Sequence, residues 1–244
     1  MALAFARQDV SVIVPARMGS ARLPGKPLAD IAGLPLVVRV LQGLEGPWRL
    51  CVATDSEEVV EAVESAGYSA LLTGPAPSGT HRVADAWRRL GSPGGMVVNL
   101  QGDEPQADAS WIRALASVDP GSDGVVTLAR RARMEDVSGP ESVKVVTGAS
   151  RNALYFSRCP IPWGAETALE HVGAYAFSPK SLVRCTGLKP SALAETERLE
   201  QLAWLEAGVG ITVVTGDFSG SGVDTEADLM RARAIYASGK ESGS

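Results

Sequence analysis

The feature that most constrains this chain is a basic loop between a strand-like segment and a helical pattern near its start. Val10–Val14 is an apolar run typical of a buried parallel strand, and apolar residues resume at helical spacing after the loop. Between them lie Arg17, Arg22 and Lys26, among small residues. In open α/β sheets, anions bind beyond the carboxyl ends of strands, where backbone N–H groups and cations meet phosphate oxygens. The pattern therefore predicts a polyphosphate site.

The two best-known phosphate loops do not match this segment. A Walker A loop has four residues between its glycines and a Ser or Thr after its Lys. Here five residues separate Gly19 from Gly25, and Pro27 follows Lys26. The dinucleotide pattern G-x-G-x-x-G is also absent after this strand, which disfavours a nicotinamide dehydrogenase. A basic solvated loop remains the simpler alternative, although only 23 Lys and Arg occur in the whole chain.

Strands and helices alternate along most of the chain, and this alternation predicts a doubly wound, largely parallel α/β sheet. Helix N-terminal caps and hydrophobic periodicity support the assignment: Asp55 or Ser56 can cap the helix that begins at Glu57, and Thr225 with Asp228 resembles a capping box. Predicted strands are Arg49–Thr54, Ser69–Thr73, Met96–Leu100, Val125–Leu128 and Ile211–Val214. Predicted helices are Glu57–Ala66, one through Val83 and Leu90, Trp111–Val118, Ala194–Glu206 and Thr225–Tyr236.

The region from about 130 to 178 follows a different pattern. Short strands are predicted at Val143–Thr147, Ala153–Ser157 and Val172–Phe177, without convincing helices between them. This favours an antiparallel insertion that acts as a dimerisation arm. With no internal repeat or linker, residues 1–244 are predicted to form a single domain.

Composition excludes several classes of function. A formal charge of −5 argues against broad nucleic-acid binding, and no apolar run is long enough to span a membrane. The start of the chain lacks the pattern of a signal peptide. Three widely spaced cysteines match no zinc pattern, and Cys51 in a strand-like run is most simply a core residue. A cytoplasmic protein is predicted.

Two carboxylates are candidates for binding a hard cation. Asp103 directly follows a predicted strand, and Mg²⁺ favours one or two carboxylates together with substrate phosphates. Asp224 precedes the last predicted helix and could complete the site. Both have structural alternatives, because Asp103 could form a turn and Asp224 could cap the helix.

A second small polar loop leads into a helix at residues 77–82. Ser78 or Thr80 could contact a base or sugar, and Thr80 could instead cap the helix. Arg82 lies in the first helical turn, where the helix dipole disfavours a cation, so it suggests a role such as holding an acidic substrate. The two histidines, His81 and His171, form no catalytic triad pattern.

Taken together and in order, these segments resemble the 3-deoxy-manno-octulosonate (KDO) cytidylyltransferases, also called CMP-KDO synthetases. The resemblance runs from Val12 to about Arg233. The first matching stretches are Pro15-Ala-Arg, Arg22-Leu-Pro-Gly-Lys26, Val52-Ala-Thr-Asp55, Pro77-Ser-Gly-Thr80 and Asn99-Leu-Gln-Gly-Asp-Glu-Pro105. They are followed by Val143-Lys-Val-Val146, Ala153-Leu-Tyr-Phe-Ser-Arg158, Pro160-Ile-Pro162, His171-Val-Gly-Ala-Tyr175, Leu199-Glu-Gln-Leu202 and Gly222-Val-Asp-Thr225.

The resemblance implies a three-layer fold of the nucleotide-diphospho-sugar transferase type and a homodimer. It also implies the reaction of CTP with KDO to give CMP-KDO and diphosphate, for lipopolysaccharide or capsule precursors, with Mg²⁺ held by Asp103 and Asp224. The catalytic residues would be Arg17, Lys26, Asp103 and Asp224. Residues implied at the nucleotide are Pro15, Ala16, Arg17, Lys26, Pro77, Ser78, Gly79 and Gln101. Residues implied at the sugar acid are Arg22, Arg82, Gln101, His171, Tyr175, Glu200 and Gln201.

One position departs from the family pattern. Many members have Ser-Gly-Thr-Asp-Arg where this chain has His81 in place of Asp, which is expected to leave Arg82 without a neighbouring carboxylate. This keeps open other keto-acid sugars, such as 8-amino-KDO or a nonulosonic acid. A nucleotide-binding relative without catalysis is a further alternative.

Overall fold

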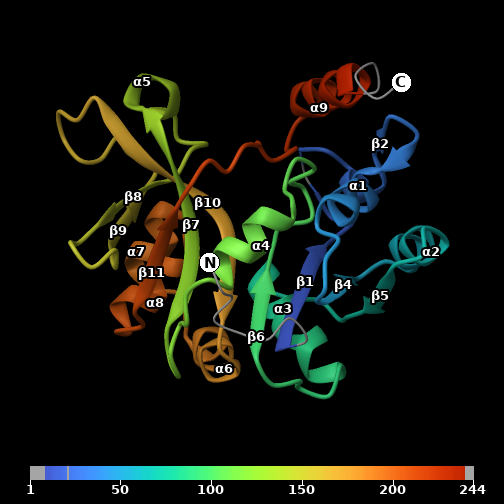
Figure 1. Cartoon of the computed structure of the whole chain (residues 1–244), viewed down its shortest axis with the longest axis horizontal. Helices are drawn as coiled ribbons and strands as arrows, with labels where there is room; N and C mark the ends of the chain where they lie inside the picture. The colour runs from blue at the N-terminus through green and yellow to red at the C-terminus, as the bar shows by residue number, and fades with distance from the viewer. Residues whose placement is uncertain (1–8, 21, 240–244) are drawn as a thin grey trace. The chain divides into compact units, whose positions relative to one another are not determined.

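The structure is a computed structural model that describes residues 9–20 and 22–239, and these form two compact units (Figure 1). Unit 2 contains Val10–Pro93, Asn99–Ile112 and the segment from Ser219 onward. Unit 1 contains Gly94–Val98 and Arg113–Phe218. The chain passes between the units within strand β6 (Met96–Asn99) and helix α4 (Ala109–Leu115). The single-domain organisation expected from the sequence stays a prediction.

Unit 2 is built on a parallel sheet formed by β1 (Val10–Ala16), β4 (Arg49–Thr54) and β5 (Ser69–Leu72). All of β1 is buried, as its apolar sequence predicts. Cys51 lies in the core of β4, where burial raises the pKa of its thiol to about 11. These three predicted strands are confirmed, and their carboxyl ends carry the loops that form the site.

Two helices of unit 2 begin with a serine that caps the helix. The helices of this unit are α1 (Leu36–Gly43), α2 (Glu57–Ser65), α3 (Gly79–Arg89) and α9 (Glu226–Gly239), with a short 3₁₀ helix η2 (Lys26–Leu28) and a hairpin of β2 (Asp30–Ile31) and β3 (Leu34–Pro35). Ser56 accepts a hydrogen bond from Val59 N at 3.4 Å, so it caps α2. Ser78, rather than the expected Thr80, caps α3.

Unit 1 contains the predicted antiparallel insertion. β10 (Thr167–Phe177) pairs antiparallel with β7 (Val125–Arg133), and β11 (Ile211–Thr215) runs parallel to β7. β8 (Lys144–Thr147) pairs antiparallel with both β10 and β9 (Ala153–Ser157). β7 and β10 extend further than the sequence predicts. Their extensions carry exposed charged residues, and cross-strand pairing rather than an apolar pattern holds them.

The helices of unit 1 depart from the prediction in three places, the first of which is the unpredicted short helix Met134–Val137. The helices of this unit are α5 (Met134–Val137), α6 (Pro179–Gly187), α7 (Ala192–Glu197) and α8 (Glu200–Glu206). The expected single helix over Ala194–Glu206 is wrong, because Arg198 adopts a left-handed conformation with φ 54° and separates α7 from α8. Helix α6 was not predicted, although Ser178 caps it and Pro179 opens it, which is a recognised start signal. Within the described ranges, no helix has the length and apolar character needed to cross a bilayer.

A buried lysine holds the base of the insertion in unit 1. The Lys144 ammonium donates to the carbonyl oxygens of Gly139, Ser142 and Arg158 at 3.1, 2.8 and 2.6 Å. Burial lowers the pKa of Lys144. Three carbonyls replace the water that this cation would otherwise bind, so the charge can be buried without a carboxylate partner.

We expect Gly43→Ala to destabilise unit 2, because a Cβ at this last residue of α1 would overlap the Ala107 carbonyl oxygen. A loss of about 1–3 kcal/mol in unfolding free energy follows from overpacking of this kind. The matched control is Gly187→Ala at the end of α6, where an added Cβ meets nothing within 4 Å. Urea denaturation compares the two, and equal stability would contradict the proposed overlap.

Candidate active site

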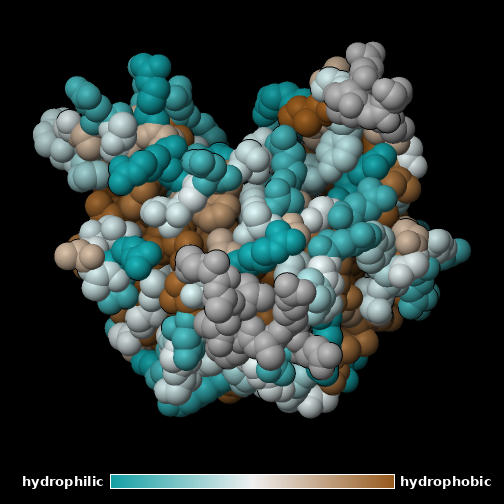
Figure 2. Space-filling model, viewed as in Figure 1, coloured by the Kyte–Doolittle hydropathy of each residue, from teal (hydrophilic) through white to brown (hydrophobic). Residues whose placement is uncertain are grey.

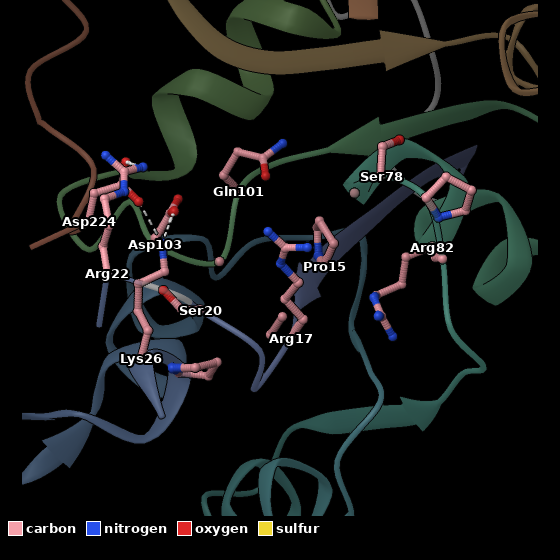
Figure 3. Close-up of a pocket in the computed structure, with 16 residues that line it drawn as sticks. Pro15, Arg17, Ser20, Arg22, Lys26, Ser78, Arg82, Gln101, Asp103 and Asp224 are labelled. Atoms are coloured by element: carbon pink, nitrogen blue, oxygen red, sulfur yellow. Dashed lines mark hydrogen bonds and ion pairs between the residues drawn. The ribbon is translucent and has the colours of Figure 1, made fainter. Parts of the chain in front are cut away.

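A polar cavity of about 480 Å³ lies in unit 2, beyond the carboxyl ends of its strands (Figure 3). Its walls come from the loop after β1, the loop that enters α3, the loop after β6 and the segment before α9. Its lining residues are Pro15, Ala16, Arg17, Ser20, Arg22, Lys26, Pro27, Ala76, Pro77, Ser78, Gly79, Arg82, Gln101, Gly102, Asp103 and Asp224. The structure thus gathers all eight residues predicted at the nucleotide around one cavity.

Lys26 links the two predicted metal carboxylates. Its ammonium lies 2.5 Å from Asp103 Oδ2 and 3.0 Å from Asp224 Oδ1. Arg22 also contacts Asp224, with 2.9 Å between Nη2 and Oδ2. Burial lowers the pKa of Lys26, but its contacts with Asp103 and then Asp224 outweigh burial, so the net shift is upward. Lys26 therefore remains a cation between two anions (Figure 3).

The start of α9 explains why Asp224 is available to these cations. Thr225 and Asp228 form the predicted capping box: Asp228 Oδ2 accepts from Thr225 N at 2.8 Å, and Asp228 N donates to Thr225 Oγ1 at 3.2 Å. Asp224 N also donates to Asp228 Oδ2, at 3.1 Å. Since these two residues cap the helix, the alternative role of Asp224 as the cap is wrong.

Asp103 and Asp224 fit the requirements of Mg²⁺. Their carboxylates converge on one cation, although they lie on separate loops. Mg²⁺ takes one or two carboxylates and completes its shell with substrate phosphates and water. No cluster of three or more His, Cys, Asp or Glu suited to a metal occurs within 9–20 and 22–239. The donor set therefore suits a metal shared with a phosphate ligand, and not a closed all-protein site.

Arg17 is the cation that remains available for an anionic ligand. In the part of the chain that the structure describes, its guanidinium pairs with no carboxylate, and it lines the cavity beside Pro15 (Figure 3). The small residues of the surrounding loops allow close approach. A Cβ on Gly102 would lie 2.8 Å from the Pro15 carbonyl oxygen, and one on Gly79 would lie 3.3 Å from Pro15 Cγ. A side chain at position 102 would therefore overlap the backbone of the phosphate loop, and one at position 79 would crowd the Pro15 ring.

The structure corrects the expectation for Arg82. Its guanidinium has a carboxylate partner, Asp55, at 2.7 Å from Nη2 to Oδ2, and it also donates to Thr73 Oγ1 at 2.6 Å. The side chain is 4% exposed. His81 instead contacts the capping residue, with 2.9 Å between Nδ1 and Ser78 Oγ. Although position 81 is His and not Asp, Arg82 still has a carboxylate partner, which comes from Asp55, a residue distant in sequence.

Sequence reasoning missed Asp55 as a functional candidate. Asp55 was a possible cap for α2, a role that Ser56 fills, and it ended one of the family-like stretches without a role of its own. Its signal was similar to that of Asp103, a carboxylate that follows a buried strand: Asp55 comes directly after β4, and Asp103 lies four residues beyond the end of β6. Such a residue lies at the edge of the sheet where ligands bind in α/β folds.

The other four residues predicted at the sugar acid belong to unit 1. His171 and Tyr175 lie on β10, with ring centroids 5.4 Å apart, and Glu200 and Gln201 open α8. Burial, and then the charge of Glu200, raises the pKa of Tyr175 well above its usual value. Tyr175 therefore stays protonated and can donate a hydrogen bond.

His171 is neutral, and its tautomer follows from its contacts. The Thr127 hydroxyl donates its single proton to Ala174 O at 2.8 Å, so the 2.9 Å contact between Thr127 Oγ1 and His171 Nε2 requires a proton on Nε2. Burial lowers the pKa of His171 to about 3. In this neutral ring Nδ1 is therefore an acceptor.

Comparison with known proteins assigns the family. The chain matches the cytidylyltransferase family over residues 11–211. A 3-deoxy-manno-octulosonate cytidylyltransferase of Anaeromyxobacter dehalogenans (strain 2CP-C) is 48% identical over 240 residues, which cover 95% of this chain and 99% of that protein. The chain belongs to the 3-deoxy-manno-octulosonate cytidylyltransferase family.

Further members of the family support the assignment. The enzyme of the same name from Anaeromyxobacter sp. (strain K) is 47% identical over 240 residues, covering 95% of this chain and 99% of that protein. A solved structure of a CMP:2-keto-3-deoxy-manno-octonic acid synthetase complexed with CTP is 36% identical, with a TM-score of 0.87, and the match covers 95% and 100% of the two chains. The predicted family and α/β fold class are confirmed.

We expect His171 to make stability depend on pH. Its pKa is about 3 when folded and 6.5 ordinarily, so the unfolded chain binds an additional proton between these values. The neutral His171 therefore contributes fully to the unfolding free energy above pH 6.5, and this contribution is lost as the pH falls. Between pH 7.5 and 5.0 this residue should lower the unfolding free energy by about 2 kcal/mol. Urea denaturation at both pH values checks this.

The variant His171→Asn isolates the effect, since asparagine does not titrate in this range. Its unfolding free energy should change by about 2 kcal/mol less between the two pH values than that of the wild-type protein. Comparing the changes, and not the absolute stabilities, removes the packing cost of the substitution. Equal changes in the two proteins would contradict a neutral His171 in the folded protein.

Proposed function

We propose that this protein transfers the cytidylyl group of CTP to 3-deoxy-manno-octulosonate (KDO), giving CMP-KDO and diphosphate for lipopolysaccharide or capsule precursors. The observation that carries the proposal is the cavity of unit 2, where Arg17, Lys26, Asp103 and Asp224 converge from separate loops in a member of this family. A cytoplasmic location stays a prediction.

The cavity is suited to a nucleotide. Its volume of about 480 Å³ lies in the usual range of small-molecule sites. We propose that Arg17 and Lys26 bind the triphosphate, and that Ser78, Gly79 and Gln101 lie near the cytidine. Gly79 supports this arrangement because its lack of a side chain opens the wall between Pro15 and Gln101, whose Oε1 would lie 3.5 Å from an added Cβ.

Asp103 and Asp224 would hold a Mg²⁺ ion, which when bound neutralises phosphate charge and polarises the group to be attacked. The two carboxylates already converge on a cation, so ion binding requires little rearrangement of the chain. Lys26 would then be released from them and could contact phosphate oxygens. The same lysine would therefore pair with the carboxylates before ligand binding and with the triphosphate afterwards.

The reaction needs positioning and charge stabilisation more than covalent catalysis. The anomeric hydroxyl of KDO attacks the α-phosphorus in line, its oxygen bonds to phosphorus, and the bond to the β-phosphate oxygen breaks to release diphosphate. The hydroxyl proton passes to solvent water as this bond forms. Arg17 and Lys26 would hold the phosphates in line and stabilise the charge that develops on them. Neither residue forms a covalent intermediate.

The acidic sugar requires a cation for its carboxylate. Arg22 is a suitable candidate, because it lines the cavity and its side chain is largely exposed while it contacts Asp224. Gln101 lines the same cavity and could hydrogen bond the sugar or the base (Figure 3). For His171, Tyr175, Glu200 and Gln201 a role at the sugar stays a prediction from the family resemblance.

The test measures diphosphate release by the purified protein with CTP, Mg²⁺ and KDO, with UTP and ATP as controls. Release that requires CTP, sugar and Mg²⁺ together supports the proposal. Relative turnover on 8-amino-KDO and a nonulosonic acid ranks the alternative sugars. Tight CTP binding without release on any sugar would instead favour a non-catalytic nucleotide-binding protein.

We expect Asp103→Asn to lose more than about 99% of turnover, because it removes one of the two carboxylates proposed to bind Mg²⁺. The control is Asp108→Asn in the same loop, since Asp108 hydrogen bonds Ser110 N and asparagine preserves this contact. The control should retain wild-type rates. Near-normal rates of Asp103→Asn at saturating Mg²⁺ would exclude Asp103 from the mechanism.

We also propose a homodimer that uses the insertion of unit 1 at residues 130–178. This insertion exposes 99% of Trp163 and 65% of Leu154. Figure 2 shows hydrophobic surface gathered over the part of unit 1 that carries β8 and β10. Exposed aromatic residues of this kind are typical of an interface between subunits.

Trp163→Ser is expected to raise the dimer dissociation constant by at least about tenfold, in line with an interface tryptophan. Analytical ultracentrifugation over a range of protein concentrations measures this. Trp48→Phe is the control, because Trp48 donates to Leu44 O within unit 2. A wild-type monomer, or a dimer unaffected by Trp163→Ser, would contradict this use of the insertion.

A further inference from the structure

Asp55 connects two loops of the cavity without lining the cavity itself. Its Oδ1 accepts a hydrogen bond from Met18 N at 3.3 Å, and its Oδ2 accepts from Arg82 Nη2 at 2.7 Å. Met18 directly follows Arg17, the cation available for the triphosphate. Arg82 lies in the first turn of α3, one turn after the residues proposed to lie near the cytidine. One carboxylate thus joins the loop proposed for phosphate to the loop proposed for the base.

The contacts of Arg82 make this connection rigid. Nη1 donates to Thr73 Oγ1 at 2.6 Å and to Gly74 O at 3.4 Å, while Nη2 donates to Asp55. Thr73 in turn donates to Thr54 O at 3.0 Å. A guanidinium held by several acceptors in this way has little freedom to move toward a ligand.

Electrostatics explain why Arg82 needs its partner. A cation in the first turn of a helix is opposed by the helix dipole, and Arg82 is also buried. With His81 as its neighbour in sequence, Asp55 is the one carboxylate within the described residues that forms an ion pair with it. Two unfavourable features are therefore offset by a single ion pair, as expected for an arginine that maintains loop geometry.

We infer that Asp55 is a positioning residue for the nucleotide: through Met18 and Arg82 it fixes the Arg17 loop relative to the start of α3. Arg82 then acts through this ion pair and not by gripping the sugar acid. The inference rests on the proposed function in taking CTP as the ligand. It adds a residue outside the cavity whose loss should weaken nucleotide binding before any sugar is present.

The test is calorimetric titration with CTP and Mg²⁺ in the absence of sugar, on the wild-type protein and on Asp55→Asn and Asp55→Ala. Both variants should weaken CTP binding by about tenfold or more, because a displaced phosphate loop loses contacts to the ligand. Asp85→Asn is the matched control. It removes the carboxylate of another Asp–Arg pair on α3, 3.0 Å from Arg89 Nε to Asp85 Oδ2, and should bind CTP as the wild-type protein does.

A double variant keeps the test valid if a single variant unfolds. Asp55→Asn with Arg82→Met removes both charges, so no buried guanidinium is left without a carboxylate. It should fold and still bind CTP at least about tenfold more weakly. In steady-state assays the KM for CTP should rise in every Asp55 and Arg82 variant, with little change in the KM for KDO.

The outcomes separate this inference from the proposed function. A wild-type protein that does not bind CTP would overturn the proposed function. Wild-type CTP affinity in both Asp55 variants and the double variant would overturn the positioning role. A raised KM for KDO in Arg82→Met, with unchanged CTP affinity, would also overturn it, because Arg82 would then contact the sugar directly.

Discussion

One ammonium group holds together the two carboxylates on which the proposed chemistry depends. Asp103 and Asp224 would repel one another, and Lys26 between them makes their convergence favourable. Among the cavity-lining residues, three cations (Arg17, Arg22 and Lys26) face these two carboxylates, a balance of +1 when the Arg82–Asp55 pair is counted as neutral. A triphosphate carries several negative charges. The protein alone cannot neutralise it, which is why a divalent cation suits this site.

The same charge balance limits what Lys26 can do alone. While Lys26 pairs with both carboxylates, they neutralise its charge, and Arg17 is the cation that remains available for the ligand. A metal ion that took over the carboxylates would release Lys26 toward the phosphates. The carboxylates and the lysine thus work as a coupled set, and the raised pKa of Lys26 reflects how strongly they interact.

Local patterns predicted the strands, and the family resemblance placed Asp103 with Asp224, whereas the ion pairs made by the arginines were beyond both. The bounds of β4, Arg49–Thr54, follow from its apolar sequence, and the capping box at Thr225 was read from spacing alone. In contrast, Arg22 and Asp224 are 202 positions apart, and nothing in the sequence places them together. Sequence neighbours also gave a wrong expectation for Arg82. Because His81 precedes it, Arg82 was expected to lack a carboxylate partner, although Asp55 supplies one from another strand end. The break at Arg198 is a backbone conformation that side-chain periodicity does not encode.

The two helices that meet the cavity show how capping and function are divided between adjacent residues. At α9, Thr225 and Asp228 satisfy the helix start, so the neighbouring Asp224 can direct its carboxylate toward Lys26 and Arg22. At α3, Ser78 caps the helix and the next residue, Gly79, presents bare backbone to the cavity. A charged side chain used as a cap would be held by the helix and lost to the ligand. Separate capping residues therefore allow groups with charge or open backbone to lie at helix starts, where backbone N–H groups favour anions.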